Sequence, residues 1–460
     1  MDPFDTADLQ ARDSAHFLHP FTDTKALSGH GARIIVRGDG IFIWDSQGHR
    51  LLDAMSGLWC VAIGYGQRRL ADAAHRQMLE LPFYNSFFKT AVVPAIDLAT
   101  RLSRLAPPGF NRVFFTNSGS EGNDTVIRMV RRYWDLQGQP GRKVILSRIN
   151  GYHGSTMGGA SLSGMDYMHA QGGLPIPDIG HIGQPYWYGS DRAESPADFG
   201  LRAARWLEDR ILAVGPERVA AFIAEPVQGA GGVIIPPETY WPEVQRIVDR
   251  YGILLVSDEV ICGFGRLGQW FGCQHYGTRP DLITFAKAVT SGYIPLGGVL
   301  VGDRVANALV EQGGEFEHGF TYSGHPTACA VALANLDIME EQDLPRHVRE
   351  DVGPYLKAGF ESLVDHPLVG HAEALGLVAG LALVADPVSG RPFDPALSVG
   401  LLCRDICFRN GLVMRAVGDR MIIAPPLVIT RPQIDELIGL VRRCLDETHA
   451  ELRVHGWLAD

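Results

Sequence analysis

Two short apolar runs each lead to one charged residue that could do chemistry. The first run, Ile253–Val256, leads to Asp258, and the second, Leu282–Phe285, leads to Lys287, 29 positions later (287 minus 258). A lysine removed from water loses its proton readily, and its neutral amine can then bond covalently to a carbonyl carbon. A plain ion pair between Lys287 and Asp258 is the alternative. The surrounding sequence has to distinguish the two.

The elements that would position this pair follow an α/β pattern. Apolar runs without polar alternation suit strands buried on both faces of a parallel sheet. Further runs of this kind occur at Val113–Phe115, Val144–Leu146, Val219–Ala224 and Gly297–Val301. Helical periodicity occurs between them at Thr125–Leu136, 201–214 and Pro242–Tyr251. Because ligands bind at the carboxyl ends of strands in such sheets, we expect Asp258 and Lys287 at one edge.

The two ends of the chain have a different character. Residues 1–65 indicate an arm and a short meander of three strands, and the part after about residue 340 alternates helices and strands in an α+β pattern. We therefore expect three segments: an N-terminal arm and small-domain segment at 1–65, a large domain at 66–335 and an α+β small domain at 336–460.

Composition excludes several classes of partner. The 460 residues are 46% hydrophobic and 20% charged, with a net charge of −11 (41 minus 52) spread along the chain. This balance argues against nucleic-acid and anionic-membrane partners, and no apolar run reaches the roughly 18 residues of a membrane span. The seven dispersed cysteines form no CxxC pair, so we expect reduced thiols, no metal site and a cytoplasmic protein.

The segment TNSGSEGND at 116–124 lies between an expected strand and an expected helix. Ser118, Gly119 and Ser120 could present backbone N–H groups and a hydroxyl to an anion at the helix start. An ordinary serine N-cap is the alternative. A helix end stabilises a charge by only about 0.3–2 kcal/mol, so an anion site here makes sense beside a stronger anchor, which Lys287 can provide covalently.

Six motifs then carry a family resemblance. They are SGSEGND at 118–124, YHGST at 152–156, EPVQG at 225–229, LVSDEVICGFGR at 255–266, TFAK at 284–287 and GFTYSGHP at 319–326. In this order, over residues 20–450, they resemble the class III aminotransferases, a fold type I family that uses pyridoxal 5′-phosphate. The resemblance implies an α/β fold with a large domain, whose mostly parallel sheet is flanked by helices, and a smaller α+β domain built from both chain ends.

The resemblance also implies roles for the residues at the expected sheet edge. Lys287 would hold the aldehyde carbon of the cofactor, pass it to the substrate amine and then act as the base. Asp258 would keep the pyridine nitrogen protonated, so that the ring stays an electron sink. Tyr152 would lie against the ring. The full cofactor-binding set implied is Ser118, Gly119, Ser120, Tyr152, His153, Glu225, Asp258, Val260, Lys287 and Thr321.

A second group of residues is implied for the substrate. Arg415 resembles the arginine that receives a substrate carboxylate in the amine:pyruvate branch, a task suited to a bidentate guanidinium; an edge salt bridge is its alternative. Trp59 and Tyr152 would surround the amine, and Phe21 would help close the pocket, which Ser155 is expected to narrow or widen. Phe87 or Phe88 would come from the partner chain.

The resemblance therefore implies an aminotransferase that moves an amino group from an ω-amino acid or primary amine to pyruvate, by ping-pong transfer through pyridoxamine phosphate. Because Thr321 would reach the cofactor of the other subunit, it implies a homodimer with shared sites, or a tetramer. Alternatives on the same fold are a 2-oxoglutarate-dependent 4-aminobutyrate, ornithine or diamine enzyme, or an aminomutase, racemase or decarboxylase. A nonenzymatic nucleotide-binding protein is disfavoured, since no phosphate-loop motif occurs in a strand-to-helix context.

Overall fold

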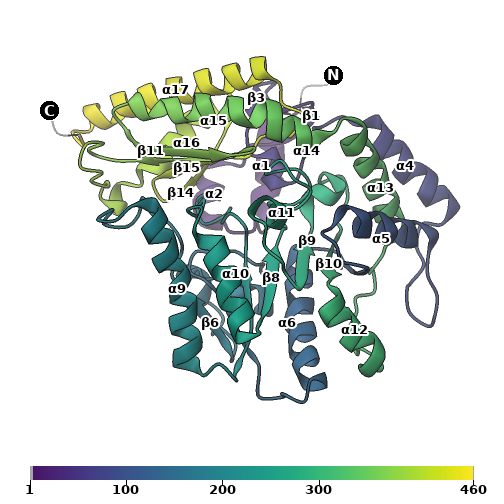
Figure 1. The fold of residues 1–460 in the computed structure, drawn as a ribbon. Coiled ribbons are helices and arrows are strands. Elements are labelled where there is room, and N and C mark those ends of the chain that lie inside the picture. The colour runs from purple at the N-terminus through teal and green to yellow at the C-terminus, as the bar shows by residue number, and fades with distance from the viewer. Residues whose placement is uncertain (1–3, 459–460) are drawn as a thin grey trace.

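A seven-stranded sheet lies at the centre of the molecule (Figure 1). The computed structural model describes residues 4–458. In spatial order the strands are β4 (Arg112–Thr116), β10 (Gly297–Val301), β9 (Leu282–Phe285), β8 (Leu254–Asp258), β7 (Val219–Ala224), β5 (Val144–Arg148) and β6 (Ile179–Ile182). Only β10 runs antiparallel to its neighbours. The mostly parallel sheet predicted for the large domain is confirmed.

Helices cover both faces of this sheet. One face packs against α6 (Gly119–Leu136) and α12 (Asp303–Gln312), and the other against α9 (Pro196–Val214) and α10 (Tyr240–Tyr251). Strand β7 shows why its sequence carries no polar alternation. Its Ile223 packs into the core of the first face and Phe222 into that of the second, and every residue of the strand is buried. A strand covered on both sides needs apolar residues at every position.

Both chain ends contribute to two smaller sheets. One contains β1 (Ile35–Asp39), β2 (Phe42–Asp45), β3 (Arg50–Asp53) and β13 (Leu412–Val413), and the other β11 (Val369–Leu375), β12 (Val378–Leu383), β15 (Arg420–Ile423) and β14 (Arg415–Val417). Strand β13 pairs in parallel with β3, which joins the two ends of the chain. The predicted domain boundaries at 65/66 and 335/336 stay a prediction.

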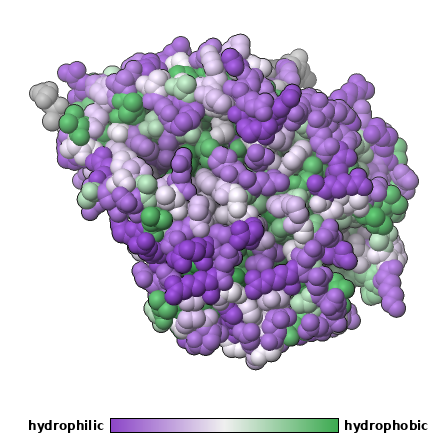
Figure 2. Space-filling view, in the orientation of Figure 1, coloured by the Kyte–Doolittle hydropathy of each residue, from purple (hydrophilic) through white to green (hydrophobic). Residues whose placement is uncertain are grey.

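Helices α15 (Gly353–Glu361), α16 (Val399–Arg409) and α17 (Arg431–Val454) pack with these sheets, and Figure 1 shows α15 and α17 side by side at one end of the molecule. The remaining α-helices are α1 (Thr6–His16), α2 (Thr24–His30), α3 (Ser56–Trp59), α4 (Arg68–Glu80), α5 (Val93–Leu105), α7 (Met157–Leu162), α8 (Asp166–His169), α11 (Gly272–Tyr276), α13 (Pro326–Glu341) and α14 (Leu344–His347). Within residues 4–458, no helix has the length and apolarity needed to cross a membrane. Hydrophilic residues cover most of the face seen in Figure 2.

Two helices begin five or six residues before the expected position. Helix α6 begins at Gly119 rather than Thr125, because Ser118 caps it and the polar residues that follow lie in its first turns. Helix α9 begins at Pro196, where Ser195 is the cap.

Candidate active site

The carboxyl ends of five strands meet at one edge of the large sheet, and each is followed by a predicted site residue. Asp258 ends β8, and Lys287 follows β9 by two positions. Glu225 follows β7, Tyr152 follows β5, and Ser118 follows β4. The juxtaposition of Asp258 and Lys287 expected from the parallel-sheet pattern is therefore present, since β8 and β9 are adjacent and parallel.

Asp258 is held rigidly below this edge. It is buried, and its Oδ2 accepts hydrogen bonds from Asn123 Nδ2 at 2.8 Å and from His153 Nδ1 at 2.7 Å. Its Oδ1 accepts from the backbone N–H of Val260 at 3.1 Å. Because Thr284 Oγ1 donates to Asn123 Oδ1 at 2.9 Å, the amide of Asn123 can only turn its NH₂ group toward the aspartate. The carboxylate is thus fixed, with Oδ1 left able to accept one more hydrogen bond.

Lys287 has the properties of a reactive amine. Its Nζ makes no hydrogen bond or ion pair with any residue among 4–458, and its φ of +52° is a left-handed conformation that costs a non-glycine residue about 1–3 kcal/mol. Burial lowers the pKa of Lys287 below its ordinary value, and Arg415 lowers it further, against the opposing effects of the Cys60 thiol and the carboxylates of Asp258 and Glu225. A larger share of this amine is therefore neutral, which is the form that attacks carbonyl carbon.

The start of α6 forms a cup beside Asp258. Ser118 caps the helix, with its Oγ accepting from the N–H of Glu121 at 3.2 Å, and the hydroxyl of Ser120 accepts from the N–H of Ser155 at 3.1 Å. Gly119 is required here, because a Cβ would lie 2.8 Å from Cγ2 of Val260. The first turn of a helix has N–H groups without intrahelical partners, so this cup suits a phosphate. Ser118 is thus an N-cap, as the alternative interpretation has it, and Gly119 and Ser120 line a cavity, where anion binding stays a prediction.

Glu225 organises the neighbouring loop. Its Oε1 accepts from the N–H of Tyr152 at 3.1 Å, and its Oε2 from the N–H of Gly229 at 2.9 Å. Burial raises the pKa of this carboxyl group. Tyr152 itself faces the cavity, and its hydroxyl lies 3.0 Å from Oγ of Ser155.

One cavity of about 780 Å³ collects most of the predicted site residues. Its wall contains Phe21, Trp59, Ser118, Gly119, Ser120, Tyr152, His153, Ser155, Asp258, Val260, Lys287 and Arg415. Glu225 lies outside this wall, hydrogen-bonded to the backbone of Tyr152. Phe87, Phe88 and Thr321 also lie outside it; Phe88 is 89% exposed and Thr321 is exposed. These three residues are predicted to enter the site of a partner subunit, and a residue with that role has to be exposed in the single chain.

Arg415 begins β14 and faces the same cavity from the side of the chain ends. Its guanidinium makes no hydrogen bond or ion pair with any residue that the structure describes, so no edge salt bridge occupies it. Burial lowers its pKa, partly offset by Tyr167 and Tyr152, but an arginine remains charged under such shifts. An unpaired guanidinium in a cavity is suited to bind a carboxylate.

Sequence reasoning missed four residues of this site. Asn123 lies within SGSEGND, whose polar composition is typical of a loop, so the local sequence gives no signal that this residue is buried. Cys60 follows Trp59 and lines the cavity; all seven cysteines are free, and Cys60 is the one that is partly exposed. Tyr167 and Arg404 also line it, but nothing in their local sequence distinguishes them from surface residues.

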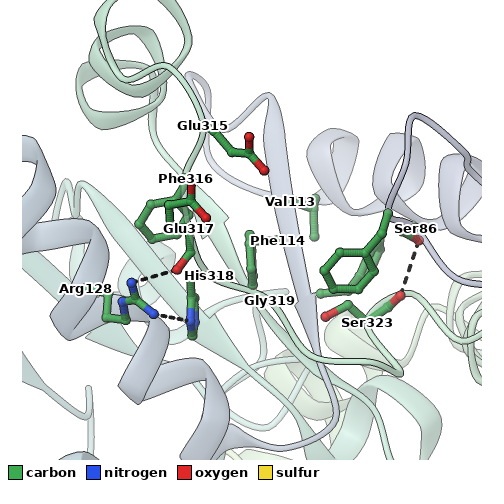
Figure 3. Close-up of a pocket in the computed structure, with 12 residues that line it drawn as sticks. Ser86, Val113, Phe114, Arg128, Glu315, Phe316, Glu317, His318, Gly319 and Ser323 are labelled. Carbon is green, nitrogen blue, oxygen red and sulfur yellow. Dashed lines mark hydrogen bonds between the residues drawn. The ribbon is translucent and has the colours of Figure 1, made fainter.

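A second cavity, of about 580 Å³, lies beside the segment that leads to Thr321 (Figure 3). Figure 3 shows Arg128 reaching His318 and the backbone of Glu317. Because Arg128 donates to Nδ1 of His318 at 3.1 Å, that nitrogen must be the acceptor, and Nε2 carries the proton toward Thr125 Oγ1 at 2.8 Å. Burial and Arg128 lower the pKa of His318. The segment before Thr321 is thereby tied to α6.

Comparisons with known proteins agree with this geometry. Residues 26–445 match the family model described as aminotransferase class III. The chain is 58% identical over 445 residues to a putrescine–pyruvate aminotransferase of Pseudomonas aeruginosa, covering 97% of each chain. It is 41% identical to a diaminobutyrate–2-oxoglutarate transaminase of Halomonas elongata, covering 98% of each.

Solved structures give the same result. An (S)-enantioselective omega-transaminase from Thermomicrobium roseum has a TM-score of 0.94 and 43% identity, with 97% of this chain and 100% of that one covered. An omega transaminase of Pseudomonas jessenii, in complex with PMP, has a TM-score of 0.93 and 42% identity, with 96% and 98% covered.

Proposed function

This chain belongs to the class III aminotransferases, whose cofactor is pyridoxal 5′-phosphate, and we propose that it transfers an amino group from a primary amine or ω-amino acid to pyruvate. The observation that carries the choice of acceptor is the 58% identity to a putrescine–pyruvate aminotransferase along 97% of both chains. The unpaired Arg415 fits this choice, since its guanidinium can receive the carboxylate of a keto acid.

The residues of the large cavity fit the cofactor. The start of α6, at Ser118, Gly119 and Ser120, would hold its phosphate through first-turn N–H groups, and the missing Cβ of Gly119 leaves room for Val260 beside it. Asp258 would accept a hydrogen bond from the ring nitrogen through Oδ1. Tyr152 would cover a ring face, and His153, Val260 and Glu225 would hold Asp258 and Tyr152 in place. When bound, the cofactor supplies an aldehyde that captures amines and a ring that withdraws electrons from the substrate carbon.

We assign the other steps of the reaction to residues of the protein. Lys287, whose pKa is lowered by burial, would hold the cofactor, and its Nζ would accept and return a proton of the substrate. Asp258, fixed by Asn123 and His153, keeps a proton on the ring nitrogen. Arg415 orients the keto acid by its carboxylate, and Trp59 and Phe21 exclude water from the amine side.

We further propose a homodimer with shared sites, or a tetramer of such dimers. Three residues are exposed and lie outside the wall of the large cavity: Phe87, Phe88 and Thr321. The tie between His318 and Arg128 fixes the segment that carries Thr321, which suits its insertion into a partner's site. The free thiols support a cytoplasmic location.

A donor screen tests the proposal. The purified protein, loaded with cofactor, is incubated with pyruvate and β-alanine, 4-aminobutyrate, putrescine, taurine or 1-phenylethylamine, and alanine is measured. We expect alanine from at least one donor and a faster reaction of the aminated enzyme with pyruvate than with 2-oxoglutarate. A preference for 2-oxoglutarate would assign the chain to the 4-aminobutyrate, ornithine or diamine group. If none of the donors yields alanine from pyruvate, the result would favour an aminomutase, racemase or decarboxylase.

A further inference from the structure

A second guanidinium faces the large cavity from the side of the chain ends. Arg404 lies in the middle of α16, lines the same cavity as Arg415, and has a side chain that is 38% exposed. Its Nε and Nη2 both donate to one oxygen of the adjacent Asp405, at 3.0 and 2.7 Å. Asp405 is itself 60% exposed. Ion pairs of this kind, open to water, contribute little to stability, so the guanidinium can exchange Asp405 for another carboxylate.

The charges on the cavity wall are unbalanced. Lys287, Arg404 and Arg415 line it, whereas Asp258 is the one carboxylate among the described residues of the wall. The oxygens of Asp258 already accept from Asn123, His153 and the Val260 backbone. Once pyruvate engages Arg415, the second guanidinium still lacks a partner within the cavity.

The two guanidiniums lie at different depths. Arg415 is close enough to Lys287 to lower the pKa of the lysine, and it is partly buried beside Tyr152 and Tyr167. The side chain of Arg404 is 38% exposed, and the exposed Phe21 and Tyr167 line the same cavity. A carboxylate bound at Arg404 therefore belongs to a molecule long enough to reach from the mouth of the cavity to Lys287.

We propose that Arg404 binds the distal carboxylate of ω-amino acid donors whose amine and carboxylate are separated by several methylene groups. This inference rests on the proposed function, and it names the donor class that the same site selects. The same guanidinium repels the second ammonium group of a diamine, so Arg404 sets the balance between amino acid and diamine donors. Apolar residues of the wall, such as Leu58 and Met165, suit the methylene chain between the two ends.

The test compares Arg404→Gln and Arg404→Glu with the wild type, using pyruvate and either 5-aminopentanoate or putrescine. We expect Arg404→Gln to lower the ratio of kcat/KM for 5-aminopentanoate to that for putrescine by about 10- to 100-fold, as when one charge-assisted pair is removed. Arg404→Glu should lower the ratio further. Arg409→Gln is the matched control, because Arg409 ends the same helix, is 61% exposed and faces Glu451 instead of the cavity. A ratio within twofold of wild type in both Arg404 variants would overturn the proposal.

A binding measurement separates this inference from the proposed function. Pentanoate carries the carboxylate without the amine, and its binding to the cofactor-loaded protein can be followed by the change in visible absorbance. We expect its dissociation constant to rise at least fivefold in Arg404→Gln and to stay at the wild-type value in Arg409→Gln. An equal constant in all three proteins would refute the role of Arg404, even if the wild type forms no alanine from pyruvate.

Discussion

Replacing Asn123 by alanine tests whether the fixed orientation of Asp258 matters for the reaction. Asn123 is 1% exposed and makes three hydrogen bonds: to Asp258 at 2.8 Å, to the backbone oxygen of His153 at 2.7 Å, and from Thr284 at 2.9 Å. The variant leaves buried partners of these bonds unsatisfied, at about 1–3 kcal/mol each. We expect the free energy of unfolding to fall by about 2–5 kcal/mol in total.

The effect on activity should exceed what lost stability explains. Asp258 would keep its bonds to His153 and Val260 but lose one of the two that fix Oδ2. A hydrogen bond to a charged acceptor contributes about 1.5–3 kcal/mol, which corresponds to about 10- to 100-fold in kcat/KM, since 1.4 kcal/mol is tenfold.

The assay measures initial rates of alanine formation and, separately, urea unfolding at a fixed cofactor concentration. Leu437→Ala is the matched control, because Leu437 is fully buried in α17, away from the cavity, and its truncation should cost a similar 3–5 kcal/mol or so. If Asn123→Ala lowers kcat/KM no more than Leu437→Ala does, the argument that Asn123 positions Asp258 is wrong.

Three further predictions follow from the same geometry. Gly119→Ala should weaken cofactor binding at least tenfold, because the new Cβ would lie 2.8 Å from Val260, and the double variant Gly119→Ala/Val260→Ala should recover part of the loss. Gly141→Ala is the control, because no atom lies near its Cβ. Equal cofactor affinities of Gly119→Ala and the wild type in equilibrium dialysis would refute the clash. Arg415→Gln should lower kcat/KM for pyruvate about 10- to 100-fold and that for 1-phenylethylamine far less, and equal losses in the two half-reactions would count against its role. Burial lowers the pKa of Lys287, so between that lowered pKa and the ordinary lysine value of 10.5 the folded apoprotein binds fewer protons than the unfolded chain. Lys287→Met should therefore make the apoprotein more stable than wild type at neutral pH. The difference in the free energy of unfolding, measured by urea denaturation, should shrink as the pH rises toward 10.5, and a difference that grows with pH would contradict the lowered pKa.

The sequence predicts best those elements that are buried on all sides, because burial requires an apolar residue at every position. Strand β7 has the predicted bounds, Val219–Ala224, because helices cover both of its faces and each position must be apolar. The start of α6 was placed six residues late, because SGSEGND has the polarity of a loop. Its small and polar residues are needed where the helix start meets Val260, Asp258 and Ser155. A local pattern does not contain those tertiary contacts.

The residues of the candidate site also differ in whether the sequence could predict their positions. The placement of Asp258 and Lys287 at one sheet edge could be predicted, because Asp258 ends one strand and Lys287 follows the adjacent strand by two positions. Asn123 and Arg404 could not, because the role of each depends on which surface its helix turns toward the cavity. For Phe87, Phe88 and Thr321, the exposure seen in one chain is what a role in a partner's site requires, and that role stays a prediction until an assembled structure is tested.

The most direct measurement asks which nitrogen holds the cofactor. The loaded protein is reduced with borohydride, digested, and its peptides are mapped by mass spectrometry. We expect the phosphopyridoxyl label on Lys287, with loss of the visible absorbance change in Lys287→Ala. A label on another lysine, or none on a protein that still forms alanine, would contradict the central claim that Lys287 is the anchoring amine.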